Sequence, residues 1–139
     1  SLGIKFYQIT SAIDYNDVIQ KLFDTIENKI AIMGLGEDGH TAGLPPGIKN
    51  EKLKIQNYVT EISDFPGEFK ERITLTFNAL SQMDILIILA FGGNKKEALI
   101  KMFDPSAGSG QEAIEEIPAR FYTKSEISKK TILITDQKI

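Results

Sequence analysis

The sequence predicts an α/β fold in which helices are layered on a mostly parallel sheet. Two segments, Ile30 to Met33 (IAIM) and Asp84 to Phe91 (DILIILAF), contain continuous apolar runs that are typical of strands buried on both faces of a parallel sheet. Each run stops at a glycine, and amphipathic helical segments alternate with the runs. Alternating strands and helices indicate a layered α/β domain. A length of 139 residues predicts a single domain over 1–139.

The segment before the first apolar run predicts one extended element and one helix. Residues Ile4 to Ile9 (IKFYQI) mix aromatic and β-branched side chains, which favours an extended segment or a first strand. From Asp14 to Asn28 apolar residues recur at helical spacing, with Asp14 or Asn16 as the candidate N-cap. We therefore expect an amphipathic helix that leads into the strand at Ile30.

The remainder of the chain predicts further strands and helices in alternation. The apolar face of the helix after Asp84 to Phe91 carries Ala98, Leu99 and Met102, which we expect to be buried. The expected elements, in order, are strands at Tyr58 to Ile62 and Arg72 to Phe77, a helical turn at Asn78 to Met83, a helix from Lys95 to Phe103, a loop at Pro105 to Gly110, a short helix at Gln111 to Glu116, a helical turn from Pro118, and a last strand at Thr131 to Thr135.

Composition excludes several classes of function. The net charge is −3 and the basic residues are scattered, so no overall field attracts nucleic acid or an anionic membrane. With no cysteine and a single histidine, the chain lacks the ligands of a zinc site, and we expect no metal. The longest apolar run is far shorter than the roughly 20 residues that span a bilayer, and no secretory signal is evident. We expect a soluble, cytoplasmic protein.

The segment Gly34 to Pro46 (GLGEDGHTAGLPP), here called the glycine loop, admits three interpretations. It is a sharp turn that needs glycine, or a G-x-G-x-x-G dinucleotide loop, or a ligand loop at the carboxyl end of a parallel strand. The prolines at its end leave no room for the helix that a dinucleotide loop opens. The third interpretation rests on Asp38, His40 and Thr41, which place an acid, an imidazole and a hydroxyl together, and the sharp turn remains open on the residues alone.

The glycine loop resembles a family signature. GLGEDGHTAGLPPG is similar to the G-x-G-x-D-G-H-T-A-S-L-F-P-G motif of 6-phosphogluconolactonases, which belong with glucosamine-6-phosphate deaminases in one sugar-phosphate superfamily. Gly43 and Pro45 depart from the motif, which has serine and an aromatic residue there. The resemblance extends through ERITLT, LAFGGNKKEAL, IPA and ILITD, and so covers Ile30 to Asp136.

The resemblance implies a fold of which this chain has only part. The family fold is a three-layer α/β/α sandwich of the NagB/RpiA/CoA-transferase-like type, with a mostly parallel sheet. Nothing in Ser1 to Lys29 resembles the phosphate loop that precedes this region in the family. The chain therefore corresponds to the C-terminal half, and we expect a homo-oligomer to cover the edge that the absent half leaves exposed.

The activity that the resemblance implies is the hydrolysis of 6-phospho-D-glucono-1,5-lactone in the pentose phosphate pathway, without metal or organic cofactor. His40 is the expected general base, and Asp38 is expected either to orient its ring or to interact with sugar hydroxyls. The expected substrate contacts come from Gly34, Gly36, Gly39, Thr41, Arg72 and Lys95, the last two for the phosphate.

Two alternatives remain open at this point. The first is a sugar-phosphate-binding module or fragment that lacks turnover, because the earlier phosphate loop is absent. The second is a deaminase-like isomerase. The deaminases have a glutamate shortly after the histidine, whereas Thr41 to Pro46 contains no acid, which disfavours this alternative.

Overall fold

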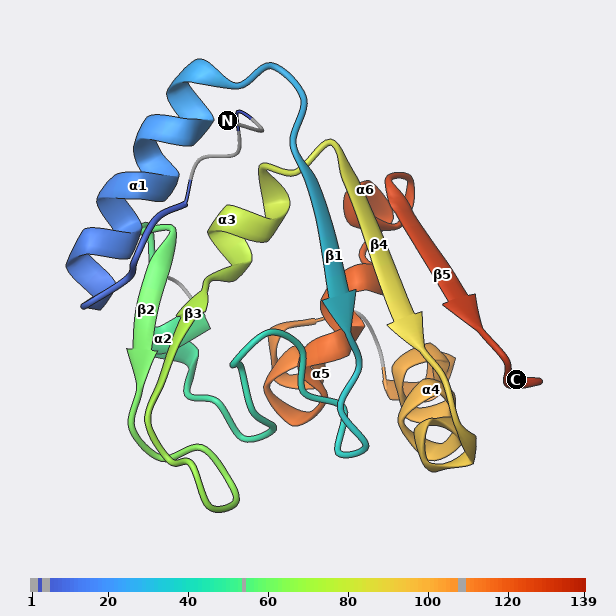
Figure 1. The fold of residues 1–139 in the computed structure, drawn as a ribbon. Coiled ribbons are helices and arrows are strands. Elements are labelled where there is room, and N and C mark those ends of the chain that lie inside the picture. Colours follow the sequence, from blue (N-terminus) through green and yellow to red (C-terminus); the bar gives the residue numbers. More distant parts are fainter. Residues whose placement is uncertain (1–2, 4–5, 54, 108–109) are drawn as a thin grey trace.

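The computed structural model describes residues 3, 6–53, 55–107 and 110–139. Its main sheet has three parallel strands, β1 (Ile30–Gly34), β4 (Ile85–Ala90) and β5 (Thr131–Thr135), in the order β1-β4-β5 (Figure 1). A separate antiparallel pair is formed by β2 (Val59–Ile62) and β3 (Arg72–Leu75). The predicted mostly parallel α/β architecture is confirmed, and all three strands end at the same edge.

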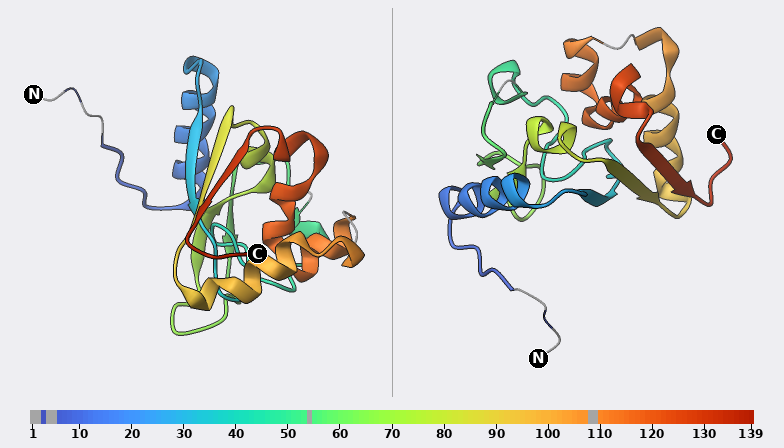
Figure 2. Two further views of the ribbon diagram at one scale, coloured as in Figure 1. Left: turned by 90° about the vertical axis from the view of Figure 1, so that its right-hand side faces the viewer. Right: turned by 90° about the horizontal axis from the view of Figure 1, so that it is seen from above.

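One face of the main sheet is covered by helices. The two views in Figure 2 place α4 (Lys96–Phe103), α5 (Gln111–Glu116) and α6 (Ser125–Ser128) on the same side, together with the 3₁₀ segment η3 (Pro118–Thr123). On β4, Leu86, Ile88 and Ala90 are fully buried in the core on this side. The predicted buried face of α4 is confirmed, because Ala98, Leu99 and Met102 lie in the same core.

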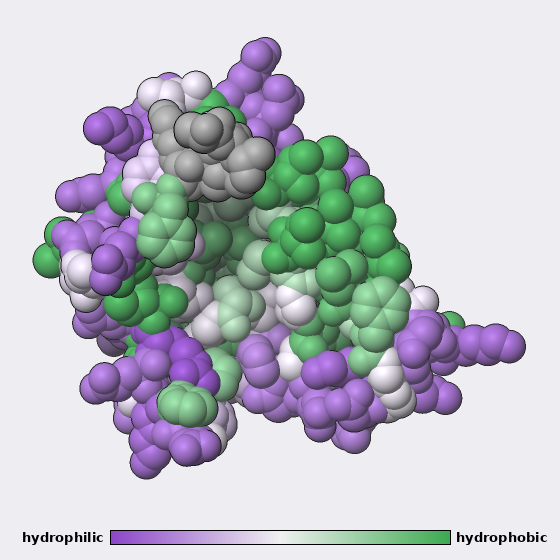
Figure 3. Space-filling view, viewed as in Figure 1, coloured by the Kyte–Doolittle hydropathy of each residue, from purple (hydrophilic) through white to green (hydrophobic). Residues whose placement is uncertain are grey.

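The opposite face of the sheet is aliphatic and open. It carries the alternate residues of the three strands, and we call it the aliphatic face: Ile30, Ile32, Ile85, Ile87, Leu89, Ile132 and Ile134. Ile32 is 67% exposed and Ile132 is 50% exposed. Figure 3 shows a continuous hydrophobic area over β1, β4 and β5. The apolar runs predicted strands buried on both faces, but the described residues cover only one. A run of apolar residues shows that the segment carries no charge. It does not show which residues cover each face of the strand.

The N-terminal helix differs from its prediction at both ends. Helix α1 spans Ala12–Thr25, and its N-cap is Ser11, whose hydroxyl accepts the amide of Asp14 at 3.1 Å. The predicted N-caps were therefore wrong. Asn16 instead ties α1 to β2, because its Oδ1 accepts the amides of Tyr58 and Val59. Of the predicted first strand, Phe6 to Ile9 form no strand, and Ile4 and Lys5 lie outside the described residues.

Beyond β2, α5 and β5 have the predicted bounds, whereas other predicted elements have shifted bounds. The hydroxyl of Thr76 accepts the amide of Ala79 as an N-cap, so the expected strand ends at Leu75 and a helix begins at Phe77. The other short elements are α2 (Asn50–Leu53), α3 (Phe77–Ser81), η1 (Gly93–Lys95) and η2 (Pro105–Ala107), and neither α2 nor α6 was predicted. In the part of the chain that is described, no helix is long and apolar enough to cross a membrane.

Candidate functional site

The glycine loop folds back on itself at the carboxyl end of β1. Leu35 forms an antiparallel bridge with Thr41. The amide of Gly36 donates to the carbonyl of His40 at 2.9 Å, and the amide of Gly39 donates to the carbonyl of Gly36 at 3.1 Å. These bonds hold the loop at the sheet edge where open α/β sheets bind their ligands.

Gly36, Gly39 and Gly43 are the three loop glycines at which an added Cβ atom would lie less than 3.0 Å from another atom. A Cβ atom at Gly36 would lie 2.1 Å from Nδ1 of His40 and 2.6 Å from Oδ1 of Asp38. Gly39 has a φ of +89°, and a Cβ atom there would lie 2.8 Å from Cγ2 of Ile117. Gly36 therefore leaves room for the side chains of Asp38 and His40, and Gly39 lets the loop pack closely against Ile117.

Asp38 and His40 form a directly bonded pair. Oδ1 of Asp38 lies 2.6 Å from Nδ1 of His40 and also accepts the His40 amide at 3.0 Å. Burial raises the pKa of Asp38, but the hydrogen bonds from the His40 amide and ring outweigh burial and hold that pKa below its ordinary value. An ionised carboxylate only accepts, so Nδ1 of His40 donates in this bond. The bond to Asp38 fixes the orientation of the His40 ring.

Thr41 points away from solvent. Its side chain is fully buried, and its hydroxyl lies 2.6 Å from the hydroxyl of Tyr122 on η3. Burial raises the pKa of Tyr122 to about 12, although the bond to Thr41 opposes that shift. The Thr41 side chain has no access to a substrate in this structure. Its position is that of a support for the glycine loop, in place of the substrate contact expected from the sequence.

A cavity of about 470 Å³ opens beside the pair, a volume within the roughly 300–1,000 Å³ of small-molecule sites. Five of the site residues that the sequence predicted line this cavity. Gly39 and Thr41 are not among the described residues that line it. The described residues that line it are Ile32, Met33, Gly34, Leu35, Gly36, Glu37, Asp38, His40, Ala42 and Lys95. Ile32 also belongs to the aliphatic face, so the cavity is continuous with that face.

The far wall of the cavity comes from the loop after β4. Lys95 is half-buried and lines the cavity, whereas its neighbour Lys96 is exposed. The side chain of Asn94 donates to the carboxylate of Glu37, which joins this loop to the glycine loop. The amide of Gly92 donates to both carboxylate oxygens of Asp136 after β5. Residues at the ends of β1 and β4 thus line one cavity, and Asp136 after β5 is bonded to the loop that follows β4.

Arg72 lies on the β2–β3 hairpin and is not among the described residues that line this cavity. Its guanidinium lies 4.8 Å from the centre of the Phe65 ring, and the His40 ring meets Phe65 edge-on at 5.2 Å between centres. Phe65 therefore joins the predicted phosphate arginine to the predicted base. Arg72 also lines a second cavity of about 410 Å³ between Glu61 and Glu71.

Sequence reasoning missed the residues that support the loop. Phe65 sits in the Pro/Gly-rich connection between two strands, and Tyr122 sits in a short 3₁₀ segment. Neither position carries a spacing signal that links it to His40. In the described residues no group of three acidic or histidine side chains is placed to hold a metal ion.

Comparisons with known proteins agree with the family resemblance of the glycine loop. The family model described as glucosamine-6-phosphate isomerases/6-phosphogluconolactonase matches residues 8–133. A probable 6-phosphogluconolactonase 2 of Oryza sativa subsp. indica is 31% identical over 121 residues, which cover 79% of this chain and 42% of the rice protein. The chain therefore spans less than half the length of this curated relative.

Solved structures match over nearly the whole chain. A 6-phosphogluconolactonase from Trypanosoma cruzi superimposes with a TM-score of 0.67 and 24% identity, covering 89% of this chain and 47% of that one. A monomeric glucosamine-6-phosphate deaminase gives 0.62 and 21%, covering 90% and 51%. These likenesses show the fold and do not separate the two activities. Because the family model matches most of its residues, the chain belongs to the glucosamine-6-phosphate isomerase/6-phosphogluconolactonase family.

Proposed function

We propose that this chain carries the hydrolytic centre for 6-phospho-D-glucono-1,5-lactone, with 6-phosphogluconate as the product, as part of the pentose phosphate pathway in the cytoplasm. The observation that carries the proposal is the 2.6 Å bond between Asp38 and His40 at the wall of an open cavity. A bonded carboxylate and imidazole are suited to activating water near neutral pH. The names of the rice and trypanosome proteins support this substrate.

In the proposed reaction His40 acts through Nε2. Nε2 takes a proton from water while the water oxygen bonds to the C1 carbonyl carbon of the lactone. The tetrahedral intermediate then loses its bond between C1 and the ring oxygen, and the ring oxygen receives the proton from Nε2. Asp38 stabilises the imidazolium in between, because its carboxylate accepts from Nδ1. The product acid loses its proton to water.

Lys95 is the proposed cation for the anionic parts of the substrate. The amides of Gly36, Gly39 and His40 are already paired within the loop, so stabilisation of the oxyanion or the phosphate must come from other donors. Lys95 lines the same cavity as the Asp38 carboxylate and the His40 ring. Arg72 contributes to phosphate binding from the far side of Phe65.

The test is a hydrolysis assay on freshly prepared 6-phosphogluconolactone, corrected for the spontaneous rate. His40→Ala is expected to lower kcat by about 10²–10⁴, the usual contribution of a general base. Lys95→Ala is expected to raise KM, and Lys96→Ala, which changes an exposed neighbour, serves as the control. A wild-type rate equal to the spontaneous rate contradicts the proposal.

A binding module is the second candidate, favoured by the open cavity that Lys95 lines. It predicts calorimetric binding of 6-phosphogluconate without turnover, and binding lost in Lys95→Ala. The deaminase-like alternative predicts ammonia release from glucosamine 6-phosphate. No acid follows His40 within the glycine loop, so we expect no release above a blank.

The proposal extends to assembly, because the aliphatic face is too apolar to remain in water. A second copy of this chain covers it. Sedimentation is expected to show a dimer that Ile32→Glu converts to monomer, since Ile32 is 67% exposed on that face. Ile100→Glu changes another exposed isoleucine, on α4, and should leave the dimer intact. A monomeric wild type would contradict this part of the proposal.

A further inference from the structure

The 3₁₀ segment η3 contacts the glycine loop on both sides of His40. The amide of Ala119 donates to the carbonyl of Gly39 at 3.0 Å, and the hydroxyl of Tyr122 bonds to that of Thr41 at 2.6 Å. His40 lies between Gly39 and Thr41 in the chain, so its backbone is fixed at both neighbours. The position of η3 therefore determines where the Asp38 and His40 side chains lie.

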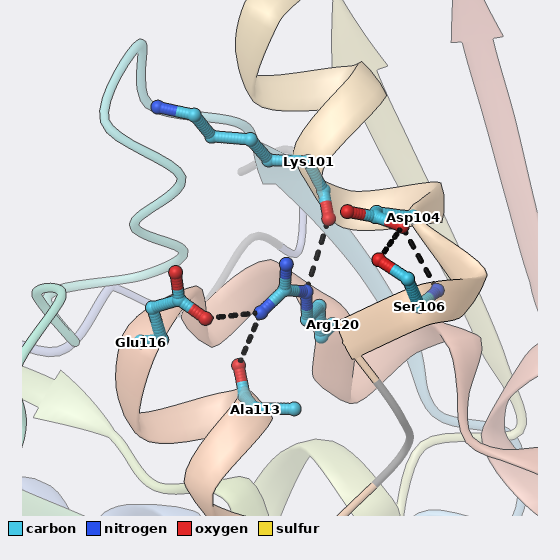
Figure 4. Close-up of polar contacts among 6 residues, drawn as sticks. All are labelled: Lys101, Asp104, Ser106, Ala113, Glu116 and Arg120. Atoms are coloured by element: carbon cyan, nitrogen blue, oxygen red, sulfur yellow. Dashed lines mark hydrogen bonds and ion pairs between the residues drawn. The ribbon is translucent and has the colours of Figure 1, made fainter.

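The segment η3 is itself held by Arg120, whose side chain is only 4% exposed. Nε of Arg120 donates to the carbonyl of Lys101 at 3.0 Å. Nη1 donates to the carbonyl of Ala113 at 3.2 Å and to the carboxylate of Glu116 at 2.8 Å. Figure 4 shows the guanidinium between the ends of α4 and α5, with Asp104 and Ser106 nearby.

The two carbonyl partners explain why an arginine occupies this position. Lys101 lies in the last turn of α4 and Ala113 in the last turn of α5, where each carbonyl also accepts the amide of the C-cap residue, Asp104 or Ile117, and carries partial negative charge. A planar guanidinium has several donors in fixed directions and reaches both carbonyls at once. A lysine has a point charge and no such fork. Arg120 thus fixes η3 to α4 and α5 together.

We propose that Arg120 is a positioning residue for the Asp38 and His40 pair, acting through η3 at a distance from the substrate. The path runs from the Arg120 guanidinium to the η3 backbone, and from Ala119 and Tyr122 to the loop. The catalytic part of this inference rests on the proposed hydrolysis. The structural part, that Arg120 sets the order of the loop, does not depend on any activity.

Amide hydrogen exchange measured by NMR tests the structural part directly. In Arg120→Met the amides of Gly36 and Gly39 are expected to exchange at least about 10-fold faster, because the loop opens more often when η3 is loose. Arg120→Lys keeps the charge and should give an intermediate rate. Glu116→Gln should have little effect, because the Glu116 side chain is 69% exposed and the two carbonyl bonds remain.

A matched control separates positioning from general loss of stability. Ile19→Ala truncates a buried side chain on α1, away from η3, and is compared at equal fraction folded. Unchanged loop exchange in Arg120→Met, or equal acceleration in Ile19→Ala, overturns the inference. If Arg120→Met does not fold, the loop exchange rates of Arg120→Lys and Ile19→Ala are compared instead, and the same outcomes overturn the inference.

Kinetics supply the second readout. Where the wild type hydrolyses the lactone, Arg120→Met is expected to lower kcat about 10-fold while KM stays within about 2-fold, since the binding cation Lys95 is untouched. A rise in KM with unchanged kcat overturns the positioning role. If the wild type shows no hydrolysis, the proposed function fails while the exchange result still decides the role of Arg120.

Discussion

The two faces of the main sheet have similar aliphatic compositions and very different surroundings. On the helix-covered face, Leu86 and Ile88 are fully buried, and η3 behind that face supports the glycine loop. On the aliphatic face, Ile32 and Ile132 are at least half exposed, and the cavity opens onto that side. The candidate site is thus packed against the core on the helix-covered side and is open on the side of the aliphatic face. This contrast separates residues that are buried in the core from residues that are exposed on the aliphatic face.

The largest expected effect is a direct comparison of two isoleucines. Ile88→Ala should lower the free energy of unfolding by about 2–5 kcal/mol, because it leaves a cavity in the closed core. Ile32→Ala should cost less than about 1 kcal/mol, since that side chain is already 67% exposed. Urea unfolding of both variants in an Ile134→Glu background excludes contributions from assembly. Equal losses would mean that the two faces are equally covered.

The second prediction concerns Tyr122 behind the loop. Its pKa is raised to about 12, so the folded state holds the phenol proton more tightly than the unfolded state does. The corresponding stability is complete below the ordinary value near 10 and is lost as pH rises towards 12. The loss is on the order of 2–3 kcal/mol. In thermal unfolding measured against pH, Tyr122→Phe should remove this loss of stability at alkaline pH. Tyr7→Phe, which changes an exposed tyrosine, should not remove it.

The third prediction compares a glycine that faces the closed side with one that faces the open side. Gly39→Ala should cost about 1–3 kcal/mol, because its φ of +89° is unfavourable and its Cβ would meet Ile117 at 2.8 Å. Gly34→Ala should change stability little, since nothing lies within 4 Å of its added Cβ. Denaturant midpoints of the two variants give the comparison. A tolerated Gly39→Ala would show that the loop is not packed on Ile117, the N-cap residue of η3.

The smallest effect is expected from the half-exposed carboxylate of the pair. The pKa of Asp38 is below its ordinary value, so its ionised form adds stability that is present above that value. This stability is lost as pH falls through the folded-state pKa. Asp38→Asn should therefore be less stable than wild type at neutral pH and equal to it in strong acid. Glu68→Gln controls for the change in net charge, and a pH-independent difference would contradict the prediction.

Much of the site could be predicted from local sequence. The glycine loop, the strands at β1, β4 and β5, and the buried side of α4 were confirmed, because each is encoded by neighbouring residues. The placement of Asp38 beside His40 also follows from a short spacing. Some failures occurred at local caps, such as Thr76 before α3, and others where a distant contact decided the outcome. Asn16, for example, bonds to β2, and Ser11 caps α1 in its place.

The sequence alone determined the family signature, the candidate base and the mostly parallel strand pattern, because these depend on residue types and spacings within single segments. Tertiary structure decided that Thr41 faces Tyr122, that Phe65 stands between His40 and Arg72, and that Arg120 fixes η3. It also decided which sheet face is closed. Such contacts join residues far apart in the chain, and an apolar or polar side chain does not itself specify its partner.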